Sequence, residues 1–277
     1  MRVNITSDRK GGNPGGYATV DLGSRVADVY FKYVNSSRIS PEVPFRVGNQ
    51  PIYEALTLQM AKKLGLSVPK VGILRSDSAQ WYRDGRIERP SSEYVFLSEI
   101  VKDVDIKGEE AELFGDEKLR EEKVYRDMLL IGDVEGRRQN YSIIGESESP
   151  RLIYIDCGCG FVDAKEGAIS QRNAITKLTR DVRSFEPLRN LRKRLKDGHK
   201  FLARKEFFTN HDVYSQQRIG CDDLVANIGS YRIPIFGGGF RRVDTIISDE
   251  EVDEIRDLMT MNMVNVVRKY KQSEVFQ

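Results

Sequence analysis

Two short apolar stretches in the middle of the chain, each with a polar residue at one end, place the strongest constraint on its fold. Asn140 precedes the stretch YSII, Asp156 follows the stretch LIYI, and the turn-forming GESESP separates them. In an antiparallel hairpin the start of the first strand lies beside the end of the second. Such a hairpin would bring Asn140 and Asp156 together, and an amide oxygen beside a carboxylate is an oxygen-only site that suits Mg²⁺. The alternative is that both residues only cap turns.

The composition is that of an ordinary globular protein, which we expect in the cytoplasm. Of the 277 residues, 39% are hydrophobic and 31% are charged, enough for a large core. No apolar run approaches the ~20 residues of a membrane span, and the start MRVNITSDRKGG lacks the apolar stretch of a signal peptide. Three cysteines without a C-x-x-C motif or a Cys/His cluster indicate a reduced chain without structural zinc.

The first hundred residues or so are predicted to be rich in β-strands, with one strong helix. Strands are expected around residues 26–34, 66–74 and 94–97, with a hairpin turn at Asp84-Gly85. The helix covers 49–65, because Asn49 can cap it, apolar residues repeat every four positions and a glycine ends it.

The remaining residues are predicted to be mainly helical, apart from the hairpin. A helical pattern covers residues 116–131, and Ser248 with Glu251 forms a capping box that opens a long amphipathic helix. We therefore expect an α+β fold, with a β-rich N-terminal part and a helical C-terminal part that carries one hairpin.

A lysine and a glutamate in the N-terminal part indicate a phosphate site. Lys32 lies inside an otherwise apolar strand, where a buried charge needs a partner. Glu54 lies one turn into the predicted helix. A strand lysine paired with a helix glutamate, next to a glycine-rich turn, is the arrangement with which kinases hold the phosphates of ATP. The alternative is a lysine on an edge strand and a solvated glutamate.

Three longer stretches resemble one kinase family. EALTLQMAKKLGLSVPKVGIL, VEGRRQNYSII and LIYIDCGCGF are similar to segments of the HipA-type serine/threonine kinases, a branch related to the phosphatidylinositol-kinase-like fold. The resemblance covers roughly residues 25 to 162. It implies a bilobal, protein-kinase-like α+β fold with an N-lobe at 1–96, a hinge at 97–101 and a mainly helical C-lobe at 102–277.

The resemblance also assigns roles to residues of this chain. It implies ATP and Mg²⁺ as cofactors and phosphorylation of Ser/Thr in a protein substrate or in the chain itself. Lys32 matches the lysine that binds the ATP phosphates, and Glu54 matches its ion-pair partner. The other matches are the Mg²⁺ ligands Asn140 and Asp156, the catalytic carboxylate Glu135, and the hinge residues that meet adenine, Leu97, Ser98, Glu99 and Ile100.

The catalytic loop departs from the family pattern, which has an aspartate where this chain has Glu135. A glutamate is still a carboxylate, but it is one methylene longer, and a misplacement of ~1 Å can cost around a hundredfold in rate. Asp133 could reach the substrate instead. The chain is thus expected to be either a kinase or a pseudokinase that binds nucleotide without transferring phosphate.

Two glycine-rich turns compete for the place over the phosphates. RKGGNPGG, which ends at Gly15 and Gly16, has the flexibility and the backbone donors for it. LGSR, at residues 22–25, is closer in sequence to the strand that carries Lys32.

A basic segment supports a different class of function. Residues 172–205 hold twelve Lys/Arg and three Asp/Glu, a local charge of +9 in a chain of net charge +2. Such a cluster can bind nucleic-acid phosphates. Interleaved apolar residues favour instead an amphipathic helix with a solvated basic face. The resemblance also implies a regulatory partner, because HipA-type kinases are toxins restrained by a DNA-binding antitoxin.

Overall fold

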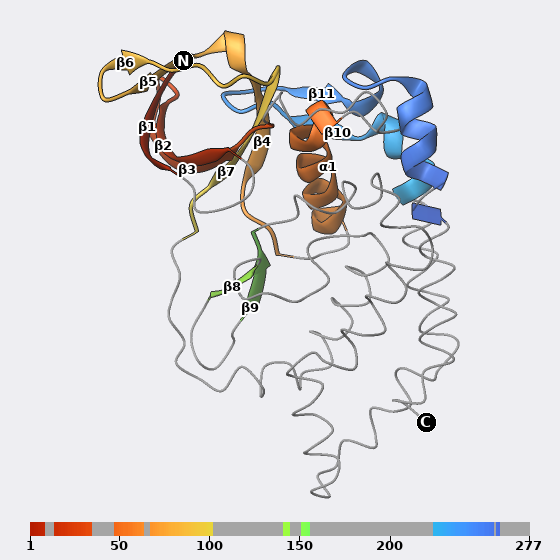
Figure 1. Ribbon diagram of the computed structural model, residues 1–277. Helices are drawn as coiled ribbons and strands as arrows, with labels where there is room; N and C mark the ends of the chain where they lie inside the picture. The colour runs from red at the N-terminus through yellow and green to blue at the C-terminus, as the bar shows by residue number, and fades with distance from the viewer. Residues whose placement is uncertain are drawn as a thin grey trace, which may run out of the picture.

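The computed structural model describes residues 1–8, 14–34, 47–63, 67–101, 141–144, 151–155, 224–257 and 259–260. These residues form an α+β structure with a large curved sheet, one helix against the sheet and a C-terminal segment beside that helix (Figure 1). The fold class predicted from the sequence is therefore confirmed.

The N-terminal sheet has seven strands in the order β4-β7-β3-β2-β1-β5-β6. All neighbours pair antiparallel except β1 and β5, which run parallel. In chain order the strands are β1 (Arg2–Asp8), β2 (Gly15–Asp21), β3 (Val26–Lys32), β4 (Val71–Arg75), β5 (Gln80–Arg83), β6 (Arg86–Ile87) and β7 (Tyr94–Glu99).

The two faces of the sheet carry different residues. Because side chains alternate along a strand, β1, β2, β3, β4 and β7 place one apolar set on the same face, where it packs around Trp81. This set forms the main core of the sheet and comprises Val3, Ile5, Ala18, Val20, Ala27, Val29, Phe31, Leu74, Val95 and Leu97. The opposite face carries Tyr30 and Lys32 on β3, next to Ser98 and Phe96 of β7 in the strand register.

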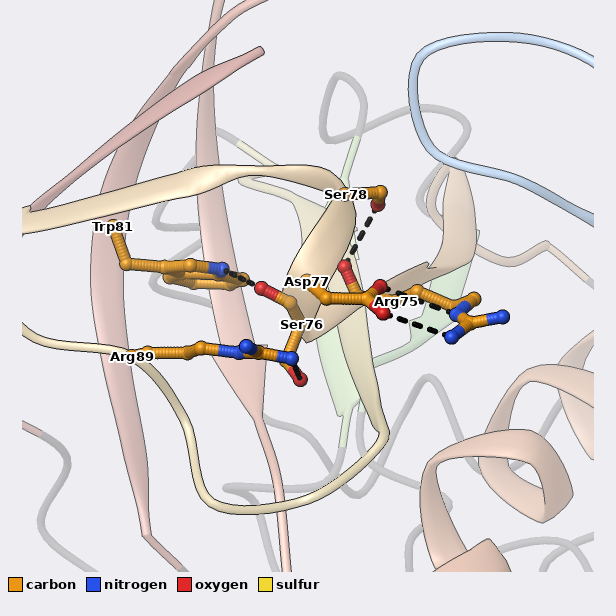
Figure 2. A network of polar contacts seen from close by, with 6 residues as sticks. All are labelled: Arg75, Ser76, Asp77, Ser78, Trp81 and Arg89. Carbon is orange, nitrogen blue, oxygen red and sulfur yellow. Dashed lines mark hydrogen bonds and ion pairs between the residues drawn. The ribbon is translucent and has the colours of Figure 1, made fainter.

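The connection from β4 to β5 is held by a polar network, which Figure 2 shows. The indole N–H of Trp81 donates to the carbonyl of Ser76 at 3.0 Å, and this bond fixes the only tryptophan of the chain in the core. The guanidinium of Arg75 donates to the Asp77 carboxylate at 2.8 and 3.1 Å, and this hydrogen bond lowers the pKa of Asp77. Arg89 donates to the Ser76 hydroxyl at 3.4 Å, and Ser78 donates to the Arg75 carbonyl at 2.8 Å.

The turn predicted at Asp84-Gly85 is confirmed. It joins β5 and β6, whose register places Arg83 opposite Arg86. Asp84 and Gly85 have φ values of 49° and 76°. Two consecutive positive φ angles are typical of the two-residue hairpin turn that Asp-Gly favours.

The helix predicted at 49–65 is present as α1 (Gln50–Lys63), preceded by the 3-10 turn η2 (Val47–Asn49). Eleven of its fourteen residues are buried, so the helix is covered on nearly every side rather than along one stripe. It packs on β7 and β4 and also against β10 (Arg232–Pro234) of the C-terminal segment.

The C-terminal segment 224–257 lies against the N-terminal sheet and α1 (Figure 1). It contains the 3-10 turns η6 (Ile228–Ser230) and η7 (Val243–Thr245), the hairpin of β10 and β11 (Phe240–Arg242), and a helix from 249 onward. The Phe236 N–H donates to the Ile73 carbonyl of β4 at 2.9 Å. A Cβ on Gly72 would lie 2.8 Å from the carbonyl oxygen of Pro234, so a glycine permits this close approach.

Two predicted local features are also confirmed. The hairpin of β8 (Tyr141–Ile144) and β9 (Arg151–Tyr154) is antiparallel, with Tyr141 opposite Tyr154. The Ser248 half of the predicted capping box is present, since the Glu251 N–H donates to the Ser248 hydroxyl at 3.2 Å, while the Glu251 carboxylate accepts from Asn49 and Tyr53. Residues 116–131 lie outside the described residues. The predicted lobe boundaries also stay predictions, because residues 102–140, which follow the predicted hinge, lie outside the described residues. Across the described ranges, no helix combines the length and the apolar character that crossing a membrane requires.

Candidate functional site

The structure brings Lys32 and Glu54 together in a buried ion pair. Lys32 is the last residue of β3, and Glu54 is the fifth residue of α1. Lys32 Nζ lies 2.6 Å from Glu54 Oε1, and the two side chains are only 5% and 1% exposed. Burial explains the close contact, because a charge removed from water needs an opposite charge nearby.

Two aromatic rings also lie near the ammonium group. Lys32 Nζ lies 5.5 Å from the centre of the Tyr30 ring and 5.8 Å from the centre of the Phe96 ring. Tyr30 shares the face of Lys32 because it is two residues earlier on β3, and Phe96 is the register partner of Lys32 on β7. Ring faces attract cations, so both rings help to hold the charge in place.

The strand register decides which glycine-rich turn lies near Lys32. Gly15 is the register partner of Lys32, so β2 begins beside the lysine and the RKGGNPGG turn leads into that end of the sheet. The competing turn LGSR precedes Val26, at the opposite end of β3. Six residue steps along a strand separate the two ends by about 20 Å. The geometry therefore favours the turn that ends at Gly15 and Gly16.

The sheet itself gives a structural reason for these two glycines. A Cβ on Gly15 would lie 2.2 Å from the carbonyl oxygen of Phe31, and a Cβ on Gly16 would lie 2.0 Å from that of Ser7. Any side chain at either position would push β2 away from its neighbours. The glycines are thus required by strand packing, and their contact with phosphates stays a prediction.

The residues predicted for the hinge belong largely to β7. The Leu97 side chain is fully buried in the main core, on the face opposite Lys32. The Glu99 N–H donates to the Lys70 carbonyl at 2.9 Å, and the Ile100 N–H donates to the Asp28 carbonyl at 3.0 Å. These two amides are already used by the sheet. Ser98 lies within the same strand and is paired in register with Tyr30 of β3 and Val71 of β4. A backbone donor for adenine would therefore have to come from Val101 onward.

The Glu99 side chain fastens the end of β7 to its neighbours. Its carboxylate accepts a hydrogen bond from Arg25 and lies 3.7 Å from Lys70 Nζ. The hydrogen bond and the negative charge of Glu99 raise the pKa of Arg25. Glu99 therefore has a clear role in holding β3 and β7 together at this end of the sheet.

The other predicted site residues lie outside the described residues. They are Asp133 and Glu135 of the catalytic loop and the Mg²⁺ ligands Asn140 and Asp156, together with the basic segment 172–205. Asn140 directly precedes β8, and Asp156 follows β9 by two residues. Among the described residues, no group of three or more His, Cys, Asp and Glu side chains could hold a metal.

One buried carboxylate near α1 was not expected from the sequence. Glu251 was predicted only as part of a capping box, yet its side chain is 4% exposed and reaches the start of α1. Asn49 and Tyr53 donate hydrogen bonds to it. The capping-box signal located the residue, but nothing local in the sequence indicates a contact that spans about 200 positions.

Comparison with known proteins finds likeness only among solved structures. The chain matches no protein-family profile and no curated protein. A solved structure described as a Helicobacter pylori proinflammatory kinase, CtkA, aligns with 98% of this chain and 94% of its own. The sequence identity is 12% and the TM-score is 0.43. A likeness at this level does not define a shared activity, so the proposals below depend on the chain's own residues.

Proposed function

We propose that the chain is an ATP- and Mg²⁺-dependent phosphotransferase of the HipA-like type that phosphorylates Ser/Thr of a protein or of itself. The observation that carries the proposal is the buried ion pair between Lys32 on β3 and Glu54 on α1. Kinases use a strand lysine for the α- and β-phosphates, and a glutamate of the adjacent helix holds that lysine in position. The residues VYFK at 29–32 begin with valine and end with lysine, as the V-A-I-K strand motif of kinases does, which supports this proposal.

The energetics of the pair support a functional interpretation. Removing two charges from water costs several kcal/mol per ion, and well-packed apolar residues in their place are often as stable or more stable. A contribution to stability alone therefore does not explain the presence of this ion pair. Lys32 fixes an ammonium group at the end of a central strand, beside a glycine-rich turn, where it can neutralise phosphate charge in a defined place.

The β8–β9 hairpin supports the Mg²⁺ part of the proposal. Its register ends with Tyr141 opposite Tyr154. Asn140 directly precedes Tyr141 and Asp156 lies two positions after Tyr154 in the sequence, so both are expected near this end of the hairpin. An amide oxygen and a carboxylate fit Mg²⁺, which keeps waters and substrate phosphates as its other ligands. Bound there, Mg²⁺ would neutralise charge on the phosphates.

The remaining step of the reaction falls to Glu135. In the transfer, the substrate hydroxyl oxygen forms a bond to the γ-phosphorus while the bond from that phosphorus to the β–γ bridging oxygen breaks, which leaves ADP. The proton of the hydroxyl passes to the Glu135 carboxylate. Positioning and charge stabilisation contribute most of the rate in such transfers, so a glutamate in place of the family aspartate is compatible with activity.

Addition of Mg·ATP is expected to raise the melting temperature of the chain. A ligand at 100 times its Kd adds about 2.7 kcal/mol to the stability of the folded state. For a chain of this size we expect a shift of about 5–10 °C. The measurement is a thermal melt with Mg·ATP, with ATP and EDTA, and with Mg²⁺ alone. Folded wild-type protein that shows no shift at millimolar Mg·ATP would rule the proposal out.

Replacement of Asp156 by Asn is expected to weaken the Mg²⁺-dependent part of nucleotide binding more than replacement of Asp163 does. Asp156 lies two positions after the end of β9, whereas Asp163 lies beyond the segments that resemble the kinase family. Titration of each variant with ATP, with and without Mg²⁺, isolates the metal-dependent part. Equal losses in the two variants would show that the ligand assignment is wrong.

The same nucleotide site also fits a pseudokinase, and the observation that favours this second candidate is Glu135 in place of aspartate. A pseudokinase would give the same thermal shift with Mg·ATP but no transfer of labelled phosphate to itself or to a protein substrate. Nucleotide binding is therefore expected for both candidates, and the transfer assay distinguishes them.

A further inference from the structure

A buried carboxylate joins the C-terminal segment to the beginning of α1. Both carboxylate oxygens of Glu251 accept hydrogen bonds from the Asn49 amide, at 2.9 and 3.0 Å. The Tyr53 hydroxyl donates to the same carboxylate. The Glu251 side chain is only 4% exposed, so these bonds lie in a region where charge–dipole interactions are strong.

Glu251 is itself held firmly by its own helix. Its backbone N–H donates to the Ser248 hydroxyl, which completes the first turn of the helix at 249–257. The apolar residues Val252 and Ile255 on the same helix are both buried. The carboxylate therefore extends from a packed and capped helix, and its position is set by that packing.

The contacts of Glu251 fall where they control the direction of α1. Asn49 directly precedes the helix, and Tyr53 lies in its first turn. A carboxylate at this end also interacts favourably with the positive end of the helix dipole. Glu251 thus binds the start of α1 through the side chains of Asn49 and Tyr53.

Tyr53 is followed directly by Glu54, the partner of Lys32. Successive helix residues project about 100° apart around the axis. Tyr53 can therefore reach the C-terminal segment while Glu54 reaches β3. A rotation or shift of the first turn of α1 that broke the Tyr53–Glu251 contact would also displace the Glu54 carboxylate from Lys32 Nζ.

We infer that Glu251 is a positioning residue for the nucleotide site: the C-terminal segment holds the first turn of α1 so that Glu54 keeps the Lys32 ammonium in place. This inference rests on the proposed function for its consequence in nucleotide binding. The mechanical part, the coupling of Glu251 to the Lys32–Glu54 pair, does not depend on a nucleotide. The site therefore includes a residue from the C-terminal segment, 197 positions beyond Glu54 in the sequence.

The test compares Glu251→Gln and Tyr53→Phe with Glu250→Gln, a matched loss of charge at the exposed neighbouring position. Tyr53→Phe removes one hydroxyl donor and keeps the ring, so it serves where Glu251→Gln does not fold. A second control, Val3→Ala, destabilises the core on the other face of the sheet without touching α1. It separates a loss of position from a general loss of stability.

Three quantities are measured for each variant. Hydrogen exchange of the α1 peptide is expected to rise about tenfold in Glu251→Gln and less in Tyr53→Phe, with the β1–β2 peptide unchanged. Acylation of Lys32, which is 4% exposed in the wild type, is expected to accelerate in the same order. The Kd for Mg·ATP is expected to rise about tenfold in Glu251→Gln and to stay unchanged in Glu250→Gln and Val3→Ala.

The outcomes separate the inference from the proposed function. Wild-type protein that binds no Mg·ATP overturns the proposed function, and the inference is then decided by α1 exchange and Lys32 acylation alone. The inference is overturned if α1 exchange and Lys32 acylation stay at wild-type values in Glu251→Gln. It is also overturned if both rise in Val3→Ala as much as in Glu251→Gln. Raised exchange and acylation with an unchanged Kd overturn the link to nucleotide binding.

Discussion

Replacement of Lys32 by Met is expected to lower the free energy of unfolding by about 3–5 kcal/mol, because it removes one partner of a buried ion pair. Met keeps most of the volume and packs well against the Tyr30 and Phe96 rings, so little of the loss comes from a cavity. The cost arises at the Glu54 carboxylate, which is 1% exposed and loses the ammonium group bonded at 2.6 Å.

The double replacement Lys32→Met with Glu54→Leu is expected to recover most of this stability. An apolar pair of similar volume in place of a buried ion pair is often neutral or stabilising by ~1–4 kcal/mol. Nucleotide binding is not expected to recover, because the ammonium group that meets the phosphates is absent from both variants. Stability and binding would thus separate in the double variant.

Urea denaturation followed by Trp81 fluorescence measures both effects. Trp81 is the only tryptophan, is 1% exposed, and its ring lies 5.6 Å from that of Phe31 on β3. The matched control is Lys70→Met, whose side chain is 79% exposed and 3.7 Å from Glu99. Lys70→Met should lower the free energy of unfolding by no more than about 1 kcal/mol. If the losses in the free energy of unfolding caused by Lys32→Met and by Glu54→Leu simply add in the double variant, the two residues are not energetically coupled and this prediction is wrong.

The features that could be predicted from the sequence are those that local patterns determine. The helix α1, the Asp84-Gly85 turn and the β8–β9 hairpin follow from capping residues, apolar periodicity and turn chemistry over short stretches. Lys32 was recognisable because a charge inside an apolar strand needs a partner, and a helix glutamate was the nearest candidate.

The features that could not be predicted depend on contacts between distant segments. β1 pairs in parallel with β5, beginning with Arg2 opposite Gln80. No residue pattern within either strand predicts this pairing. The periodicity of α1 indicated one buried stripe, but the C-terminal segment covers a second side of the helix, so most of its residues are buried. Glu251 was located by its capping box, while its contact with Tyr53 depends on how two helices pack.

The two glycines show how one residue type can serve two purposes. Gly15 and Gly16 were interpreted from the sequence as a loop over phosphates. In the structure both are required where β2 approaches Phe31 and Ser7 closely. The local sequence could not separate these explanations, because both need a residue without a side chain. The strand register adds the missing information by placing Gly15 opposite Lys32.

Replacement of Glu135 by Gln is expected to lower phosphate transfer about a hundredfold while leaving nucleotide binding nearly intact. Gln keeps the size of the side chain and removes the charge that accepts the proton of the substrate hydroxyl. General-base assistance contributes ~10²–10⁴-fold in rate, and a loose transition state places phosphoryl transfer near the lower end. The measurement is transfer of labelled phosphate at saturating Mg·ATP, together with the Kd of each variant.

Glu135→Asp then separates an active kinase from a pseudokinase. In an active kinase the shorter side chain restores the family residue, so the rate should hold or rise. In a pseudokinase no variant should show transfer, even where the thermal shift with Mg·ATP is large. Asp133→Asn is the matched control, because it removes a carboxylate two positions earlier in the same loop. Transfer that survives Glu135→Gln but is lost in Asp133→Asn would assign the proton acceptor to Asp133, and the spacing argument that selected Glu135 would be wrong.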